Sequence, residues 1–164
     1  MVVLDTSTLI LLAKIDLLPL LAEKTRIRIP KEVQQEALVK PQLYDAKMIV
    51  EMIRMGKIQV WRELPVQFQK QLQEDFGVEA GEASALLLAR QIHAPIATDD
   101  GLAIKAAKVM GIPFMTSLHV LTELYTKGRI DQKTALYKLE KLEKIGRYSL
   151  QLMEDARESI QKKR

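Results

Sequence analysis

Two short apolar segments of this chain each end in acidic residues. Val2–Leu4 is followed by Asp5, and Ile96–Thr98 is followed by Asp99 and Asp100. Aspartate is a poor residue for a strand interior, so each acid marks the point where a predicted strand stops. In an open parallel sheet, ligands bind beyond the carboxyl ends of the strands. If the two strands are neighbours, Asp5 and Asp100 meet in one crevice.

Further acids stand near the starts of predicted helices. Glu82 lies in the first turn of an alanine- and leucine-rich segment, and Glu32 and Glu36 lie one turn apart after Pro30. Each has an ordinary alternative explanation. The helix dipole favours a carboxylate in a first turn, and two acids one turn apart can form a solvated face. The combination of the acids is therefore more informative than any one of them.

Carboxylates that converge need a counterion. Two of them ~4 Å apart repel by roughly 4 kcal/mol at an effective dielectric constant near 20, so a group of four requires a divalent cation or raised pKa values. Oxygen ligands without cysteine favour Mg²⁺ or Mn²⁺, and we expect neither His93 nor His119 to bind the ion. Such an ion beside a basic surface suits phosphodiester hydrolysis, because it activates water and stabilises the leaving oxygen.

The elements that position these acids alternate between short β-branched runs and longer amphipathic segments. Strands are predicted at residues 2–5, 26–29, 58–61, 95–98 and 113–116, with helices between them. This alternation predicts right-handed crossovers and a parallel sheet, and strands that are apolar on both sides predict helices on both faces. From Leu118 the chain is predicted to be helical throughout. The expected fold class is α/β: a single three-layer α/β/α domain over residues 1–164, with a core at about 1–120 and a helical C-terminal extension at about 121–164.

Composition narrows the class of protein. A chain of 164 residues fits one domain with a sizeable core, and the absence of cysteine excludes disulfides and thiolate metal sites. The apolar stretches Leu9–Ala13 and Ala83–Ala89 are far shorter than the ~20 residues that span a bilayer, and we see no signal peptide. We therefore expect a cytoplasmic protein without membrane contact. Residues 129–164 hold ten Lys/Arg and six Asp/Glu, a basic excess that fits either nucleic-acid binding or a solvated helix face.

The acids lie in motifs that resemble those of PIN-domain ribonucleases, in the same order and at similar spacing over residues 1 to about 120. The matching stretches are Asp5–Ser7, Pro30–Glu36 (Pro-x-x-Val-x-x-Glu), Gly81–Ala85, Thr98–Asp100 (Thr-x-Asp) and Ala107–Gly111 (Ala-x-x-x-Gly). The second motif favours Glu36 over Glu32. The resemblance implies a PIN-like sheet in the order 3-2-1-4-5, which places the first and fourth strands side by side.

The resemblance also implies roles for single residues. The implied catalytic acids are Asp5, Glu36, Glu82 and Asp100, with Asp5, Glu82 and Asp100 as the ligands of Mg²⁺ or Mn²⁺. Hydroxyls beside the acids can orient them, and the expected groups around the ligands are Ser7, Thr98 and Asp99; Ser7 could instead cap a helix, and Asp99 could be a ligand or a cap.

The C-terminal part resembles a prokaryotic PIN subgroup with a helical extension. The similar segments are Thr116–Leu121 and Lys127–Ile130. Many members of this subgroup are VapC-type toxins that pair with a small antitoxin, and members often form homodimers. The leucine-rich segment Leu136–Ile145 fits core packing or a dimer seam. The chain departs from the subgroup at Ile104, where arginine is common, so we name the adjacent Lys105 as a possible RNA contact.

We therefore expect a Mg²⁺- or Mn²⁺-dependent endoribonuclease acting on an RNA substrate, with the toxin role of a VapBC-type pair implied by the resemblance. One alternative is a PIN-like module that binds RNA or protein without catalysis. Another is a nuclease that processes ribosomal RNA. A phosphatase with Asp5 as nucleophile is disfavoured, because the second aspartate of such enzymes is replaced by Ser7.

Overall fold

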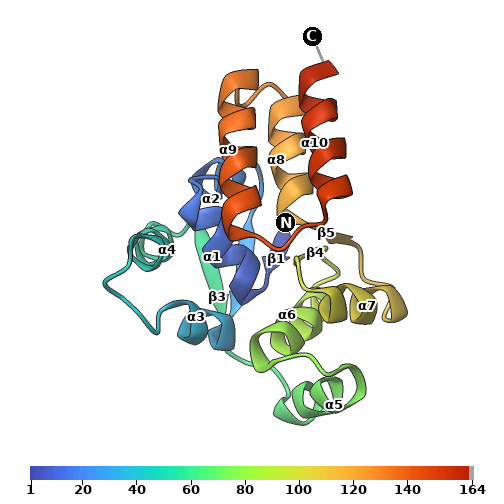
Figure 1. The fold of residues 1–164 in the computed structure, drawn as a ribbon. Helices are drawn as coiled ribbons and strands as arrows, with labels where there is room; N and C mark the ends of the chain where they lie inside the picture. The colour runs from blue at the N-terminus through green and yellow to red at the C-terminus, as the bar shows by residue number, and fades with distance from the viewer. Residues whose placement is uncertain (163–164) are drawn as a thin grey trace.

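A five-stranded parallel sheet forms the centre of the molecule (Figure 1). The computed structural model describes residues 1–162. The strands are β1 (Val2–Leu4), β2 (Ile27–Pro30), β3 (Ile58–Trp61), β4 (Ile96–Ala97) and β5 (Phe114–Met115). Their order is β3-β2-β1-β4-β5, and every neighbouring pair is parallel. The predicted fold class and strand order are confirmed.

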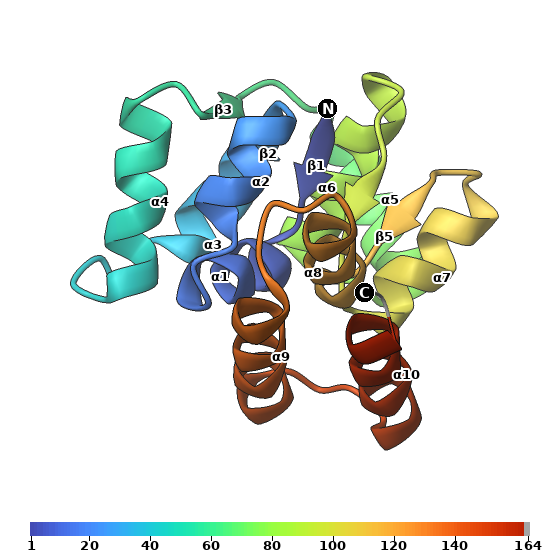
Figure 2. The ribbon, with the colours of Figure 1, turned by 90° about the horizontal axis from the view of Figure 1, so that it is seen from above.

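Helices cover both faces of the sheet, as its order requires. The helices are α1 (Thr6–Lys14), α2 (Leu18–Lys24), α3 (Lys31–Ala37), α4 (Tyr44–Arg54), α5 (Val66–Phe76), α6 (Ala80–Gln91), α7 (Gly101–Val109), α8 (Ser117–Thr126), α9 (Gln132–Ile145) and α10 (Leu150–Lys162). The chain moves outward from β1 to β3 and then returns to β4 on the far side of β1. Because crossovers are right-handed, the helices before and after this reversal lie on opposite faces. Figure 2 shows α6 on one side of β1, with α1, α2 and α8 on the other.

The core lies between the sheet and these helices. Val3, Leu4 and Ile96 have no exposed surface, and neither does Leu86 of α6. Helix α6 buries small residues as well as leucines, which allows it to lie close against β1, β2 and β4. The reversal between β1 and β4 is therefore held rigidly by apolar contacts.

The predicted helical C-terminal extension is confirmed, although the chain is not helical at every residue from Leu118 onward. The extension forms three helices, α8 to α10, because two glycine-containing turns interrupt the pattern. Gly128 adopts a left-handed conformation with φ of 66° after α8, which glycine accommodates at low cost. Asp131 then begins α9 by accepting a hydrogen bond from the Thr134 amide at 2.7 Å.

The three C-terminal helices pack together and against the sheet domain (Figure 1). Leu139 and Leu142 of the leucine-rich segment are fully buried inside the chain, whereas Ile145 is 47% exposed. The buried Lys138 ammonium donates a hydrogen bond to the Ile15 carbonyl at the end of α1, at 2.6 Å. The helical extension is therefore joined to the sheet domain by polar as well as apolar contacts. Over residues 1–162, no helix has the length and apolar character needed to cross a membrane.

Candidate acidic site

Asp5 is a fully buried carboxyl group of which only one oxygen accepts hydrogen bonds. It directly follows β1 and caps α1, where its Oδ1 accepts a hydrogen bond from the Thr8 amide at 2.9 Å. Its Oδ2 has no hydrogen-bond partner among the described residues. Burial raises the pKa of Asp5 to about 6, although Thr98 and Thr8 lower it in part. A buried charge without a partner is costly, so a proton or a bound cation would stabilise this oxygen.

Glu82 lies near the same point from the opposite face of the sheet. It sits in the first turn of α6, and its Oε2 accepts a hydrogen bond from the Glu79 amide at 2.8 Å. Partial burial, together with repulsion from Asp100 and Asp5, raises the pKa of Glu82 to about 7. This repulsion means that the three predicted ligands share one electrostatic environment.

Asp100 follows β4 and begins α7. Its Oδ1 accepts a hydrogen bond from the Ala103 amide at 2.8 Å. The buried hydroxyl of Thr98 accepts a hydrogen bond from the Asp100 amide at 3.1 Å. Thr98 therefore fixes the backbone of one predicted ligand and also lowers the pKa of another, Asp5. Ser7 donates to Asp5 Oδ1 at 3.3 Å and does not itself cap the helix.

Glu36 is held by two elements at once. Its Oε1 accepts a hydrogen bond from the Gly81 amide at 3.0 Å, and its Oε2 accepts one from the Thr6 hydroxyl. Thr6 directly follows Asp5, and Gly81 directly precedes Glu82, so Glu36 ties the two helix starts together. A Cβ at Gly81 would collide with the Thr6 hydroxyl and the Glu36 carboxylate, so a larger residue there would have to displace these two side chains.

Asp99 joins the sheet domain to the C-terminal helices. Its Oδ1 accepts a hydrogen bond from the Ser117 amide at 2.9 Å, and its Oδ2 accepts hydrogen bonds from the Ser117 and Tyr148 hydroxyls. Ser117 is the first residue of α8, and Tyr148 lies between α9 and α10. Both oxygens of Asp99 are therefore engaged within the protein, and the proximity of Asp99 contributes to the raised pKa of Tyr148, after burial.

The side chains of the three predicted ligands are not arranged to coordinate one metal ion. Over residues 1–162, no three His, Asp or Glu side chains are arranged to bind one ion as they stand. Asp5 and Asp100 each direct one oxygen to a backbone amide of the helix that they cap, and Glu82 directs one to the amide of Glu79, the N-cap of its helix. The donor set is all oxygen, which fits Mg²⁺ or Mn²⁺, and the unpartnered Asp5 Oδ2 fits the need for a cation.

A cleft of about 380 Å³ lies beside the acids and contains residues that sequence reasoning missed. Its walls include Glu82, Asp99 and Asp100. They also include three unpredicted polar side chains, from the end of α1 and from the loop after α9: Lys14, Arg147 and Tyr148. Sequence spacing gave no signal for Arg147 and Tyr148, because the loop that contains them lies next to the acids only through the packing of the three C-terminal helices. Lys105 is exposed on α7 and is not among the lining residues.

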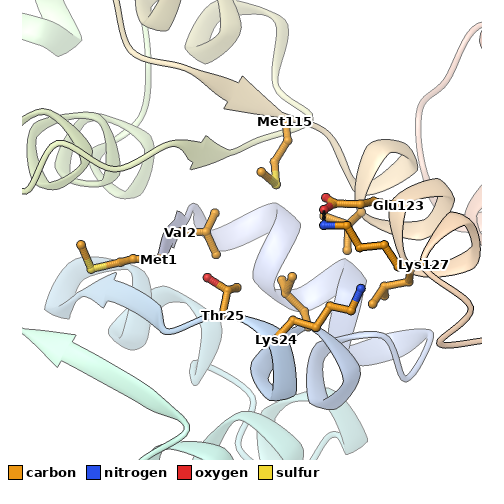
Figure 3. A pocket seen from close by; sticks show the side chains of 10 residues that line it. Met1, Val2, Lys24, Thr25, Met115, Glu123 and Lys127 are labelled. Atoms are coloured by element: carbon orange, nitrogen blue, oxygen red, sulfur yellow. Dashed lines mark hydrogen bonds and ion pairs between the residues drawn. The ribbon is translucent and has the colours of Figure 1, made fainter.

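A second cavity, of about 270 Å³, lies among α2, α8 and the start of β1 (Figure 3). It contains none of the predicted site residues. Figure 3 shows the Lys24 side chain extending toward Lys127 and Glu123, which form an ion pair with each other. The Lys24 ammonium is shielded from solvent and has no hydrogen-bond partner among residues 1–162. Desolvation and repulsion from Lys127 and Arg129 lower its pKa.

The two histidines lie at helix ends. His119 lies in the first turn of α8, where its Nδ1 accepts a hydrogen bond from the Thr116 amide at 3.2 Å. His93 follows α6 with a positive φ of 51°.

Comparison with known proteins gives one family. A family model described as a PIN domain, DUF3368, matches residues 1–162. No protein with a curated description and no solved structure matches the chain. The matched region includes both the sheet and the three C-terminal helices, so the extension is part of the family pattern.

Proposed function

Because this chain belongs to the PIN-domain family, whose members are generally nucleases, we propose that it is a metal-dependent endoribonuclease. The proposed ligands of Mg²⁺ or Mn²⁺ are Asp5, Glu82 and Asp100. The observation that carries the proposal is the buried Asp5 Oδ2, which lacks a partner beside two further carboxylates that repel each other. When bound, the ion would supply an activated water and neutralise charge on the leaving oxygen.

The acids differ in what they are free to do. Asp5 is fixed by burial and by the Thr8 amide, so its free oxygen has a defined direction. Glu82 has a pKa of about 7 and is only half-buried, so it can exchange a proton with water near neutral pH. Glu36, a predicted catalytic acid, has both oxygens bonded within the protein. This supports a positioning role for Glu36, which keeps Asp5 and Glu82 close together.

Cleavage of RNA by Asp100→Asn protein tests the proposal. Asparagine remains a good helix N-cap, so this change removes the charge while sparing α7. A labelled RNA mixture is incubated with Mn²⁺, with Mg²⁺ or with EDTA. We expect cleavage that requires metal and is lost in the variant. Asp131→Asn, a matched change at the N-cap of α9, is expected to cleave like the unchanged protein. Cleavage that survives both EDTA and Asp100→Asn would refute the proposal.

We further propose that the nuclease acts as the toxin of a VapBC-type pair. The only support for this step is the resemblance of the C-terminal part to that subgroup. Expression of the protein in bacteria should stop growth, and Asp100→Asn should abolish the effect. Normal growth despite active, soluble enzyme would instead favour a processing nuclease. A protein that binds RNA with unchanged affinity in EDTA and never cleaves it would favour the binding-module alternative.

A further inference from the structure

We propose that the loop between α9 and α10 forms the substrate-binding wall of the acidic cleft, with Arg147 contacting an RNA phosphate next to the acids. The segment Ile145–Tyr148, which consists of the last residue of α9 and the three residues after it, is called the 145–148 loop below. This inference rests on the proposed nuclease function. It assigns the recognition of the RNA backbone to the C-terminal extension.

Position is the first argument. All four residues of the 145–148 loop line the same cleft as Glu82 and Asp100. Figure 1 shows the connection between α9 and α10 at the end of the three-helix bundle that faces the sheet, and Tyr148 in this connection contacts Asp99, two residues after β4. A nucleic acid bound at the acids would therefore touch this loop.

The loop is held in place at both sides of Arg147. The Tyr148 hydroxyl donates a hydrogen bond to Asp99 Oδ2 at 3.1 Å. On the other side, the Gly146 amide donates to the Leu142 carbonyl at 2.7 Å. A Cβ at Gly146 would collide with the Tyr148 ring and lie 2.8 Å from that carbonyl. The glycine thus allows the loop to fold tightly onto the end of α9, which presents Arg147 from a fixed backbone.

Charge is the third argument. Arg147 is exposed and has no ion pair among the described residues, whereas Arg157 of the same helical bundle is paired with Glu143 at 3.1 Å. A guanidinium group presents a planar pair of donors that matches phosphate oxygens. Lys14 provides a second cation at the far end of α1. The acids would repel a phosphate backbone, so cations in the same cleft are needed to hold it.

Binding of RNA separates this inference from catalysis. A fluorescent single-stranded RNA is titrated with Asp100→Asn protein in Mn²⁺ at several salt concentrations. Arg147→Ala, introduced into the Asp100→Asn protein, should weaken RNA binding about tenfold. It should also reduce the slope of log Kd against log salt concentration by about one, which corresponds to the loss of one phosphate contact. Arg147→Lys should recover part of the affinity. Arg90→Ala, at the opposite end of α6 from Glu82, is the matched control and should bind like the parent.

A second variant tests how the loop is positioned. Tyr148→Phe removes the hydroxyl that donates to Asp99, and we expect the KM of RNA cleavage to rise roughly threefold with kcat little changed. Melting temperature and Mn²⁺ affinity, measured in all variants, should be unchanged for Arg147→Ala, since Arg147 is exposed.

The outcomes distinguish the two proposals. Arg147→Ala protein that binds RNA with unchanged affinity and salt dependence overturns the inference, as does parent protein that binds no RNA at any salt concentration. If binding depends on Arg147 but no preparation cleaves RNA, the nuclease proposal fails and the inference stands.

Discussion

A shielded charged group without a hydrogen-bond partner lies beside the acidic cleft, and another lines the second cavity, called the Lys24 cavity below. Beside the cleft it is the Oδ2 of Asp5, and in the Lys24 cavity it is the ammonium of Lys24. Both groups have pKa values shifted in the direction that burial dictates. By these criteria alone the two regions would be equally good candidates for binding an ion.

Their surroundings differ. Glu82 is repelled by both Asp5 and Asp100. Lys14 and Arg147 line the adjoining cleft, but neither forms an ion pair with these acids among the described residues. Lys24 lies in the last turn of α2, where the helix dipole favours a cation, and Glu123 offsets part of the repulsion from the neighbouring cations. An unpartnered buried charge therefore indicates a ligand only where its own neighbours cannot compensate it.

The largest expected effect is the loss of RNA cleavage when one of the acids is changed. Asp5→Asn removes a proposed ligand while keeping its shape, and we expect RNA cleavage to fall roughly 100-fold or more. Added Mn²⁺ should raise the melting temperature of the unchanged protein and not that of the variant. Asp75→Asn, an exposed change on α5, is the control for both measurements. Full activity in Asp5→Asn would remove the distinction between the two regions.

The stability of the metal-free protein should fall as pH rises. Asp5 has a pKa of about 6 when folded, against an ordinary value of 3.8, so the folded state holds a proton that the unfolded state releases between pH 4 and 6. The free energy of unfolding therefore decreases across about pH 4–7, by about 3 kcal/mol for Asp5. Glu82 acts in the same direction.

Denaturant unfolding in EDTA, compared between the unchanged protein and Asp5→Asn, measures this effect. The difference between the two proteins should be small at pH 4 and largest near pH 8. Mn²⁺ should reverse the trend, since the ion binds the deprotonated acids. A pH-independent difference would contradict the assignment of the effect to Asp5.

A smaller effect, on the free energy of unfolding, is expected when the packing around the acids is disturbed at Gly81. Gly81→Ala would force its new methyl group against Thr6 and Glu36, and we expect a loss of about 1–3 kcal/mol in the free energy of unfolding, with lower activity. Gly101→Ala is the matched change, because its Cβ would meet open space in the first turn of α7. Equal stability of the two variants, measured by urea unfolding, would show that the contact of Glu36 with Gly81 is loose.

The smallest effect is expected in the Lys24 cavity. Lys24→Met keeps much of the side-chain volume and removes the shielded charge. RNA cleavage should be unchanged, and the melting temperature should move by no more than about 2 °C. A large loss of cleavage in this variant would mean that the cavity, and not only the cleft, contributes to function.

The fold was predictable from the sequence because its elements obey local rules. Alternating short apolar strands and amphipathic helices specify the parallel sheet, and the acids at strand ends specify its binding edge. The strand order came from the family resemblance and is confirmed. The helical C-terminal extension is confirmed, but the sequence pattern did not show its two breaks, because the turns at Gly128 and Gly146 outweigh the helical pattern around them.

The cleft was only partly predictable. Asp5, Glu82 and Asp100 each stand beside a strand end or a helix start, where local sequence gives their position. Tyr148 and Arg147 reach the cleft through contacts between helices distant in sequence, such as the Tyr148 hydrogen bond to Asp99, 49 residues away. No periodicity within a single segment encodes such a contact. The roles of the acids as ligands stay a prediction until metal binding is measured.

The hydrogen bond from Lys138 to the end of α1 has a consequence for the order in which the protein is made. The two groups are separated by 123 residues. A chain emerging from the ribosome folds its N-terminal parts first, yet the end of α1, the helix capped by Asp5, gains its hydrogen bond from Lys138 only when α9 has emerged. The wall of the cleft is later still, because Tyr148 follows α9. The cleft of this PIN-domain protein is therefore incomplete until α9 and the residues after it have been synthesised and have left the ribosome.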